Sequence, residues 1–427
     1  MDRIIVRGGL PLYGSVSISG AKNAALPLMA ASLLTKETLV LSNVPQLSDT
    51  VTMSHLLMNH GVKLSICGRE SDDCTKHKVF LNAEKITNFQ APYEIVKKMR
   101  ASVLVLGPLV ARFGYAKVSM PGGCAIGTRP INLHLEALEA MGAKINLEEG
   151  YIEAIAKNGL HGAEIDFKFV SVGATENILM AATLASGKTI LRNAAMEPEI
   201  SDLAKLLNRM GAKISGIDTN VLEIEGVSEL HGTDYSVIFD RIEAGTYAVA
   251  AVITGGELIL ENVEYEVCSN IMDRIVEIGA IITNLGNNKI KVTANGQRKA
   301  LDIITGEYPG FPTDMQAQLM ALLSVSKGIS TITENIFENR YMHVPELNRM
   351  GAKVFTRGGI ATIEGVDQLY GAEVMATDLR ASVSLILGGL VAKGETVINR
   401  VYHLDRGYEK LEDKFSKCGA DIYRVIS

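Results

Sequence analysis

The hydrophobic and polar positions of the chain follow a pattern that recurs about every 70 residues. In each recurrence an apolar helical segment ends at a glycine, and a short strand of alternating residues follows, as in LEAMGAKINL and LNRMGAKVFT. The glycines of this pattern are Gly61, Gly142, Gly211, Gly279, Gly351 and Gly419, at separations of 68 to 81 residues. Glycine suits the end of a helix because it adopts the left-handed backbone conformation without steric cost. The pattern therefore predicts six copies of one structural unit.

A second element recurs in the same units, namely an Ala/Leu-rich helix, a turn and a β-branched strand that closes on asparagine. AATLASGKTILRNAA and AAVITGGELILENVE are two examples. The closing asparagines are Asn43, Asn193, Asn262, Asn335 and Asn399. The unit around LVARFGYAKVSM keeps the helix and the strand but continues into MPGGCAIGTRP, residues 120–130. One unit therefore departs from the repeat, at a glycine-rich segment that contains a single cysteine.

Six units predict two domains of three units each, because 427 residues exceed the usual size of a single domain. The first segment, GSVSISGAKN, matches a strand-to-helix joint inside later units. The chain therefore begins within a unit, and its first strand should complete the last one. We expect one domain at 22–238 and the other at 239–427 plus 1–21, with a hinge and a cleft where the chain crosses twice. The fold class is α/β, with apolar helices buried at the centre of each domain.

Composition narrows the class of protein. Hydrophobic residues make up 47% of the chain and charged residues 21%, and the net charge is −6. This charge argues against a general nucleic-acid or membrane-surface binder, since those carry a basic excess. The apolar runs near 24–34 and 381–392 are too short to span a bilayer. The five cysteines are odd in number and scattered, which favours the reducing cytoplasm.

The starts of the predicted central helices carry cations, which are Lys22, Arg100, Arg241 and Arg380. A positive charge is unfavourable at a helix N-terminus. One such lysine could be a solvated side chain, but four cations at the same place in four repeats favour an anionic ligand, because helix N-termini also bind anions. Asp314 and Asp378 suit the helix dipole as ordinary N-caps.

Histidines and cysteines give weaker signals. Cys67, Cys74 and His77 have poor spacing for zinc, so no metal site is expected. The isolated histidines His134, His343 and His403 are interpreted as core or rim residues rather than catalytic groups.

Nine short segments carry a recognisable combination of residues, namely GAKNAALP, MRAS, PGGCAIGTRP, VSVGAT, EPEI, FPTDMQAQ, FENRYMHVPEL, ATDLRAS and YHLDRGYE. Together they resemble the UDP-N-acetylglucosamine enolpyruvyl transferases, from residue 1 to about 425. The resemblance implies transfer of the enolpyruvyl group of phosphoenolpyruvate to the 3′-hydroxyl of UDP-N-acetylglucosamine, which is the first committed step of peptidoglycan synthesis. It implies two similar domains, each of three βαβαββ units in an inside-out α/β barrel, with the active site in the cleft. It implies no cofactor.

The resemblance also implies which residues bind the substrates. For phosphoenolpyruvate they are Lys22, Asn23, Arg129 and Arg406. For the nucleotide sugar they are Asn23, Arg100, Arg129, Pro130, Ile131, Asn132, Leu133, Ser171, Val172, Gly173, Asp314 and Ile336. Supporting roles in the second domain fall on Glu338, Arg340, Asp378 and Arg380. The chain departs from the family at Phe169, where many relatives have lysine; here the lysine stands one residue earlier, at Lys168.

The implied catalytic residues are Cys124, Asp314, Lys22 and Arg406. The reaction needs an acid that protonates C3 of phosphoenolpyruvate, a base that takes the sugar hydroxyl proton, and cations around the departing phosphate. Asp314 is the expected base, although on the sequence alone an N-cap role fits it as well. Cys124, on a segment with Gly122, Gly123 and Gly127, is the expected acid or product-release group. The family implies that its thiol adds to phosphoenolpyruvate and is alkylated by the epoxide fosfomycin.

Two other functions remain open at this point. The shikimate-pathway enolpyruvyl transferases share the fold and an early lysine, but they lack a Pro-Gly-Gly-Cys segment. A catalytically silent paralogue would bind UDP-sugars without reaction, and it should have lost at least one of Lys22, Cys124, Asp314 and Arg406, all of which are present.

Overall fold

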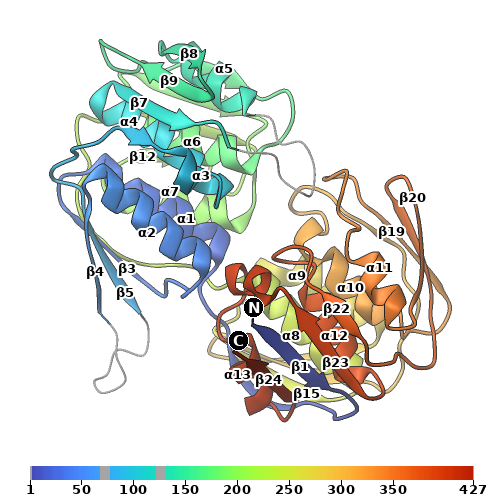
Figure 1. The fold of residues 1–427 in the computed structure, drawn as a ribbon. Coiled ribbons are helices and arrows are strands. Elements are labelled where there is room, and N and C mark those ends of the chain that lie inside the picture. Colours follow the sequence, from blue (N-terminus) through green and yellow to red (C-terminus); the bar gives the residue numbers. More distant parts are fainter. Residues whose placement is uncertain (1, 68–76, 122–130, 427) are drawn as a thin grey trace. The chain divides into compact units, whose positions relative to one another are not determined.

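The computed structural model describes residues 2–67, 77–121 and 131–426. The chain forms two compact units (Figure 1). Of the described residues, those from Gly20 to Ile238 form one unit, and those up to Ser19 together with those from Phe239 onward form the other. We call them the Gly20–Ile238 unit and the Phe239 unit.

The Gly20–Ile238 unit contains three four-stranded sheets. The first is β14 (Asp234–Ser236), β3 (Thr38–Ser42), β5 (Lys78–Asn82) and β4 (Lys63–Cys67). The second is β6 (Gln90–Ala91), β7 (Tyr115–Ser119), β9 (Tyr151–Ile155) and β8 (Lys144–Glu148). The third is β10 (Glu164–Asp166), β11 (Lys188–Arg192), β13 (Val221–Glu225) and β12 (Lys213–Ser215). In each sheet the first pair is parallel and the other two pairs are antiparallel.

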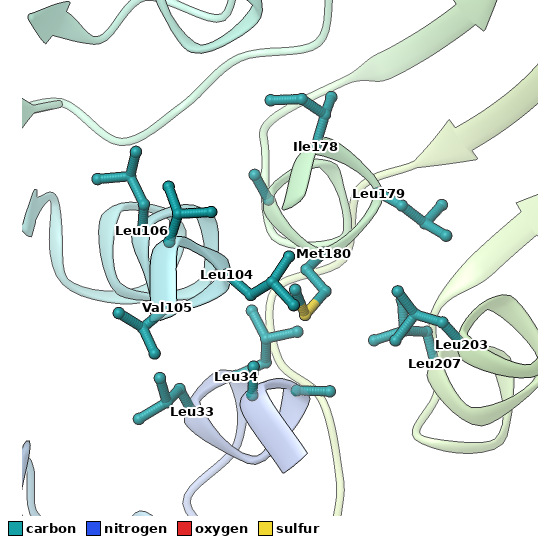
Figure 2. Packing of buried hydrophobic residues seen from close by; sticks show 14 of the residues in the cluster. Leu33, Leu34, Leu104, Val105, Leu106, Ile178, Leu179, Met180, Leu203 and Leu207 are labelled. Atoms are coloured by element: carbon teal, nitrogen blue, oxygen red, sulfur yellow. The ribbon is translucent and has the colours of Figure 1, made fainter. Parts of the chain in front are cut away.

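The helices of this unit are α1 (Lys22–Ala30), α2 (Ser48–His60), α3 (Tyr93–Val96), α4 (Leu106–Phe113), α5 (Asn132–Ala140), α6 (Val172–Ala182) and α7 (Pro198–Arg209), with the 3₁₀-helices η1 (Ala31–Leu34) and η2 (Arg100–Val105). Every residue of α6 from Ala174 to Ala182 is buried, as expected of a central helix. Figure 2 shows part of the core around it, where Leu33, Leu104, Met180 and Leu203 come from four different helical segments. The core therefore lies among the helices, and the sheets form its outer walls.

The Phe239 unit repeats this arrangement with the same pairing directions. Its sheets are β22 (Glu373–Met375), β23 (Glu395–Asn399), β1 (Arg3–Arg7) and β24 (Asp421–Val425); β2 (Tyr13–Ser17), β15 (Glu257–Glu261), β17 (Lys289–Ala294) and β16 (Ala280–Gly286); and β18 (Ile303–Ile304), β19 (Ile329–Thr333), β21 (Ile360–Glu364) and β20 (Lys353–Arg357). Its helices are α8 (Arg241–Thr254), α9 (Tyr265–Ile278), α10 (Gln316–Leu323), α11 (Val344–Arg349), α12 (Val383–Val391) and α13 (Leu411–Lys417), with η3 (Thr313–Met315) and η4 (Val401–Arg406).

The structure confirms the predicted repeat. Six sheets correspond to the six units, and the six helix-ending glycines all have positive φ, from 92° at Gly351 to 146° at Gly279. The first strand does complete the last unit, since β1 pairs with both β23 and β24. Within the described residues, no helix is long and apolar enough to cross a membrane.

Two expectations about helix starts were wrong in detail. Arg100 begins the 3₁₀-helix η2 rather than an α-helix, and Arg380 lies in the turn before α12, three residues ahead of its first residue Val383. Asp378 does cap this turn, because its carboxylate accepts the backbone N–H groups of Arg380 and Ala381, both at 2.8 Å. Arg380 is therefore held beside the helix start and not within it.

A tight contact recurs where the last strand of a repeat returns to the central helices. Gly226 follows β13 and Gly365 follows β21, and each donates its N–H to a glycine carbonyl, of Gly187 at 2.9 Å and of Gly328 at 3.0 Å. An added Cβ would lie 1.6 Å from the carbonyl oxygen of Ala185 or Ser326, respectively. Glycine is required at both places because the two backbones touch.

Gly365→Ala should therefore destabilise the Phe239 unit by at least about 1–3 kcal/mol, the usual cost of overpacking a well-packed contact. The matched control is Gly306→Ala in the same unit, where the nearest atom to an added Cβ is 3.9 Å away. Calorimetric unfolding of both variants checks this. Equal melting temperatures for the two variants would contradict the close approach.

Candidate active site

In the Gly20–Ile238 unit, Lys22 is a buried cation with a buried carboxylate as its partner. It is the first residue of α1, whose N-cap residue makes no side-chain cap, and only 7% of Lys22 is exposed. Its Nζ lies 2.9 Å from Oδ2 of Asp49, which comes from the first turn of α2. Asp49 neutralises a charge that the helix dipole and burial both disfavour. Asp49 was not among the residues singled out from the sequence.

Three of the expected nucleotide-sugar segments meet in this unit, around His134. Helix α5 begins at Asn132 and carries Leu133, while Ser171 caps α6 by accepting the N–H of Ala174 at 3.4 Å. A Cβ on Gly173 would lie 3.5 Å from the His134 ring, and the charge of Arg100 acts on the same imidazole. The start of α6 therefore lies beside His134, and the charge of Arg100 acts on the same ring.

His134 is a buried, hydrogen-bonded histidine, as interpreted from the sequence. The side-chain oxygen of Asn177 accepts the N–H of Gly107 at 2.6 Å, and its amide nitrogen donates to the Val103 carbonyl at 3.0 Å. The second hydrogen of that nitrogen points to His134 Nδ1 at 3.0 Å, so the ring proton resides on Nε2. Burial, and to a lesser extent the charge of Arg100, lower the pKa of His134 to about 4.

Lys168 stands next to exposed Phe169, and its Nζ lies 3.0 Å from Oε2 of Glu136 on α5. Both side chains of this ion pair are well solvated, so the pair contributes little stability. It places a lysine next to α5 in the same unit as the region around His134.

In the Phe239 unit, Asp314 accepts from one arginine and lies close to a second. Its Oδ1 accepts from Arg340 at 2.8 Å, and its Oδ2 lies 3.6 Å from Nε of Arg380. The interpretation of Asp314 as an N-cap is wrong, because neither η3 nor α10 has a side-chain cap. Burial lowers the pKa of Arg340, but the carboxylates of Asp314, Asp378 and Glu334 outweigh it and raise that pKa overall. Asp314 is therefore held as a partly exposed carboxylate against buried guanidinium groups.

Arg380 connects Asp314 to two other functional segments. Its guanidinium donates to Oδ2 of Asp240 at 3.1 Å and to the carbonyl of Gly407, next to Arg406, at 3.0 Å. The other carboxylate oxygen of Asp240 caps α8 by accepting the N–H groups of Ile242 and Glu243, at 2.8 and 3.0 Å. Asp240 was missed in the sequence, although an Asp directly before a predicted helix start is an N-cap signal.

Glu334, which was also missed, orients the segment that contains Ile336. Its Oε1 accepts the N–H groups of Ile336 and Phe337 at 2.9 and 3.1 Å, and its Oε2 accepts the Thr313 hydroxyl at 2.8 Å. One buried carboxylate therefore ties the Ile336 backbone to the residue before Asp314. Glu338, by contrast, lies exposed in the turn that follows.

The negative charge of Asp378 acts on the pKa of both His343 and His403. Burial lowers the pKa of His343 to about 4, with Asp378 opposing this effect and Arg340 adding to it. Burial and the charge of Arg406 lower the pKa of His403. Both rings are therefore favoured in the neutral form. Among the described residues, no group of three or more histidine, cysteine or carboxylate side chains could hold a metal ion.

The structure places the other expected residues as follows. Asn23 is half-buried on the first turn of α1, and Arg406 is half-buried at the end of η4. Ile131 is buried just ahead of α5. Cys124, Arg129 and Pro130 lie outside the described residues.

Comparisons with known proteins define the class first. The family model described as EPSP synthase (3-phosphoshikimate 1-carboxyvinyltransferase) matches residues 6–415. The enolpyruvyl transferase NikO from Streptomyces tendae has the same fold, with a TM-score of 0.88, 22% identity, and coverage of 100% of this chain and 99% of the other. EPSP synthase from Acinetobacter baumannii covers 100% of both chains with a TM-score of 0.74 and 18% identity. The fold is thus the two-domain α/β fold of the enolpyruvyl transferases, as expected.

Sequence relatives narrow the class further. The UDP-N-acetylglucosamine 1-carboxyvinyltransferase of Paramagnetospirillum magneticum is 56% identical over 100% of this chain and 99% of its own length. That of Granulibacter bethesdensis is 57% identical over 100% of both chains. The chain therefore belongs to the UDP-N-acetylglucosamine 1-carboxyvinyltransferases, within the family that the EPSP synthase model describes.

The neutral state of His134 predicts a pH dependence of stability. Its folded pKa lies below the usual 6.5, so the unfolded chain binds the proton first and stability is lost as pH falls from about 6.5 toward 4. This histidine alone should cost about 2 kcal/mol between pH 7 and pH 5. His134→Gln keeps a hydrogen-bond acceptor for Asn177, and its free energy of unfolding should lack this part of the pH dependence. Urea unfolding of both proteins at the two pH values measures it, and identical slopes would contradict the assignment.

Proposed function

We propose that this chain transfers the enolpyruvyl group of phosphoenolpyruvate to the 3′-hydroxyl of UDP-N-acetylglucosamine and releases phosphate, as the first committed step of peptidoglycan synthesis. The observation that carries the proposal is the full-length identity of 54–57% to curated relatives with the same enzyme name. The arrangement of charged side chains in each unit supports it.

The reaction proceeds by addition and elimination. A proton adds to C3 of phosphoenolpyruvate while the sugar oxygen bonds to C2, and the hydroxyl proton leaves to a base. The tetrahedral intermediate then loses a C3 proton and phosphate, which restores the double bond. The intermediate carries a carboxylate and a phosphate on one carbon, so cations are needed around C2.

Asp314 is the proposed base. A base that must be ionised before the reaction needs cations around it, and Arg340 and Arg380 supply them at 2.8 and 3.6 Å. Asp314 remains about a quarter exposed, with 24% of its side chain accessible, so a substrate hydroxyl can reach it. The arginines also hold the carboxylate in one orientation.

Lys22 and Arg406, with Arg129, are the proposed ligands of the phosphoenolpyruvate anion, and Asn23 is proposed to contact both substrates. Cys124 is the proposed acid or product-release group. The proposed sugar-nucleotide contacts are Arg100, Arg129 to Leu133, Ser171 to Gly173, Asp314 and Ile336. The proposed contacts include residues of both units.

The proposed location is the cytoplasm. Cys67, Cys268 and Cys418 are free thiols in the structure, and unpaired cysteines are typical of reducing compartments. The substrates are small anionic molecules, and the proposal involves neither nucleic acid nor membrane insertion.

The choice of acceptor tests the proposal. Phosphate release from phosphoenolpyruvate is measured with UDP-N-acetylglucosamine and, separately, with shikimate 3-phosphate. We expect release with the nucleotide sugar only. Release with shikimate 3-phosphate alone would identify a shikimate-pathway enzyme. Binding of the nucleotide sugar without release would identify a silent paralogue.

Lys22→Ala should abolish turnover, because the ammonium offsets the charge of the substrate and the intermediate. The substitution also removes one partner of a buried ion pair, which costs about 3–5 kcal/mol of stability. The double variant Lys22→Ala/Asp49→Asn also removes the charge of Asp49 and should regain stability without regaining turnover. Lys36→Ala, at an exposed lysine of the same unit, is the matched control. A double variant that is stable and retains more than about a tenth of wild-type kcat would rule out a central role for Lys22.

A further inference from the structure

The two chain neighbours of Arg406 are each held by a different arginine. On one side, the carbonyl of Gly407 accepts from Arg380 at 3.0 Å. On the other side, the Asp405 carboxylate accepts from both terminal nitrogens of Arg424, with NH1 at 3.0 Å from Oδ2. This is the paired, bidentate geometry that fixes a carboxylate in direction as well as distance.

The helix that ends at Arg406 has little core packing of its own. η4 has six residues, of which Val401 and Leu404 are buried. It starts from Arg400 in the left-handed conformation, with φ of 58°, and has no side-chain cap. Apolar burial thus anchors one face of η4, and the polar contacts at Asp405 and Gly407 orient its end.

Arg424 is itself held in place from several directions. It lies on β24, between the buried residue Ile422 and the end of the chain. Its Nε donates to Oε1 of Glu412, in the first turn of α13, at 2.5 Å, and its NH1 lies 3.7 Å from Oδ2 of Asp2. The hydrogen bond to Asp405 is the largest of several carboxylate effects that raise the pKa of Arg424, so the side chain is charged at all working pH values.

We propose that Arg424 is a positioning residue for phosphoenolpyruvate binding, because it orients Arg406 through the Asp405 carboxylate. The proposal rests on the proposed function, in which Arg406 binds the phosphoenolpyruvate anion. Arg424 touches no substrate in this scheme. It fixes the position of the last residues of η4, so the Arg406 guanidinium already has one orientation before the anion binds.

A purely structural role would give a different result. Arg424, on β24, also contacts α13 and Asp2, so its loss should lower stability whatever else it does. A general loss of stability affects both substrates alike. A misdirected Arg406 affects phosphoenolpyruvate, because the proposed sugar-nucleotide contacts lie elsewhere.

The experiment compares variants along this chain of contacts. Arg424→Met removes the guanidinium and with it the contacts to Asp405, Glu412 and Asp2. Asp405→Asn removes the charge that Arg424 holds and keeps the side-chain shape. Glu412→Gln is the matched control, because it weakens a different contact of Arg424 and leaves Asp405 in place. Arg424→Lys keeps the charge but not the bidentate fork.

We expect Arg424→Met and Asp405→Asn to raise KM for phosphoenolpyruvate about tenfold or more, with KM for UDP-N-acetylglucosamine changed less than about twofold. The KM of Arg424→Lys for phosphoenolpyruvate should lie between those of these two variants and that of the wild type. Glu412→Gln should keep the wild-type KM values. The double variant Arg424→Met/Asp405→Asn should be no worse than the single variants, since both break the same contact.

Two results would overturn the inference, namely equal increases in both KM values or the same phosphoenolpyruvate effect in Glu412→Gln. If Arg424→Met fails to fold, the shape-conserving Asp405→Asn decides between the same outcomes. A wild-type protein without phosphate release would instead refute the proposed function, so the two failures are distinguishable.

Discussion

The contacts of the buried Arg380 guanidinium are the interactions on which the Phe239 unit depends most. Arg380 is 2% exposed, and it contacts the cap of α8 at Asp240, the carboxylate of Asp314 and the backbone beside Arg406. A buried charge with several oppositely charged or polar partners is stable only while all of them are present, because each one offsets part of the cost of desolvation. Arg380 therefore fixes these three segments relative to one another. Its position beside Tyr408, at 5.4 Å from the ring centre, adds a further favourable contact.

The Gly20–Ile238 unit uses the same principle with a lysine. Lys22 starts a helix whose dipole repels it, and Asp49 from the next helix compensates. In both units a cation at or near the start of a central helix thus forms an ion pair with a carboxylate from another element. Such a site is organised before a ligand arrives, and an anionic ligand meets a cation whose geometry is already fixed.

Much of the fold was predictable from the sequence because the signals are local and repeated. The helix-ending glycines, the alternating strands and the continuous apolar helices each depend on a few neighbouring residues, and six copies make the pattern unambiguous. The pairing of β1 with β23 and β24 was also predictable, since the first segment matches the middle of later units. The candidate residues of the site came from short motifs, and in the structure Gly173 lies beside His134, on which the charge of Arg100 also acts.

What the sequence could determine by itself was the repeat, the α/β class, and the residues of the motifs. The partners of those residues were decided by the tertiary structure. Asp49, Asp240, Glu334 and Arg424 were not singled out, because ion pairs and hydrogen bonds between buried side chains depend on proximity in space, which local periodicity does not encode. Asp314 shows the difference most clearly: its sequence neighbours indicate an N-cap, whereas Arg340 and Arg380, 26 and 66 residues further along the chain, give its carboxylate a different role.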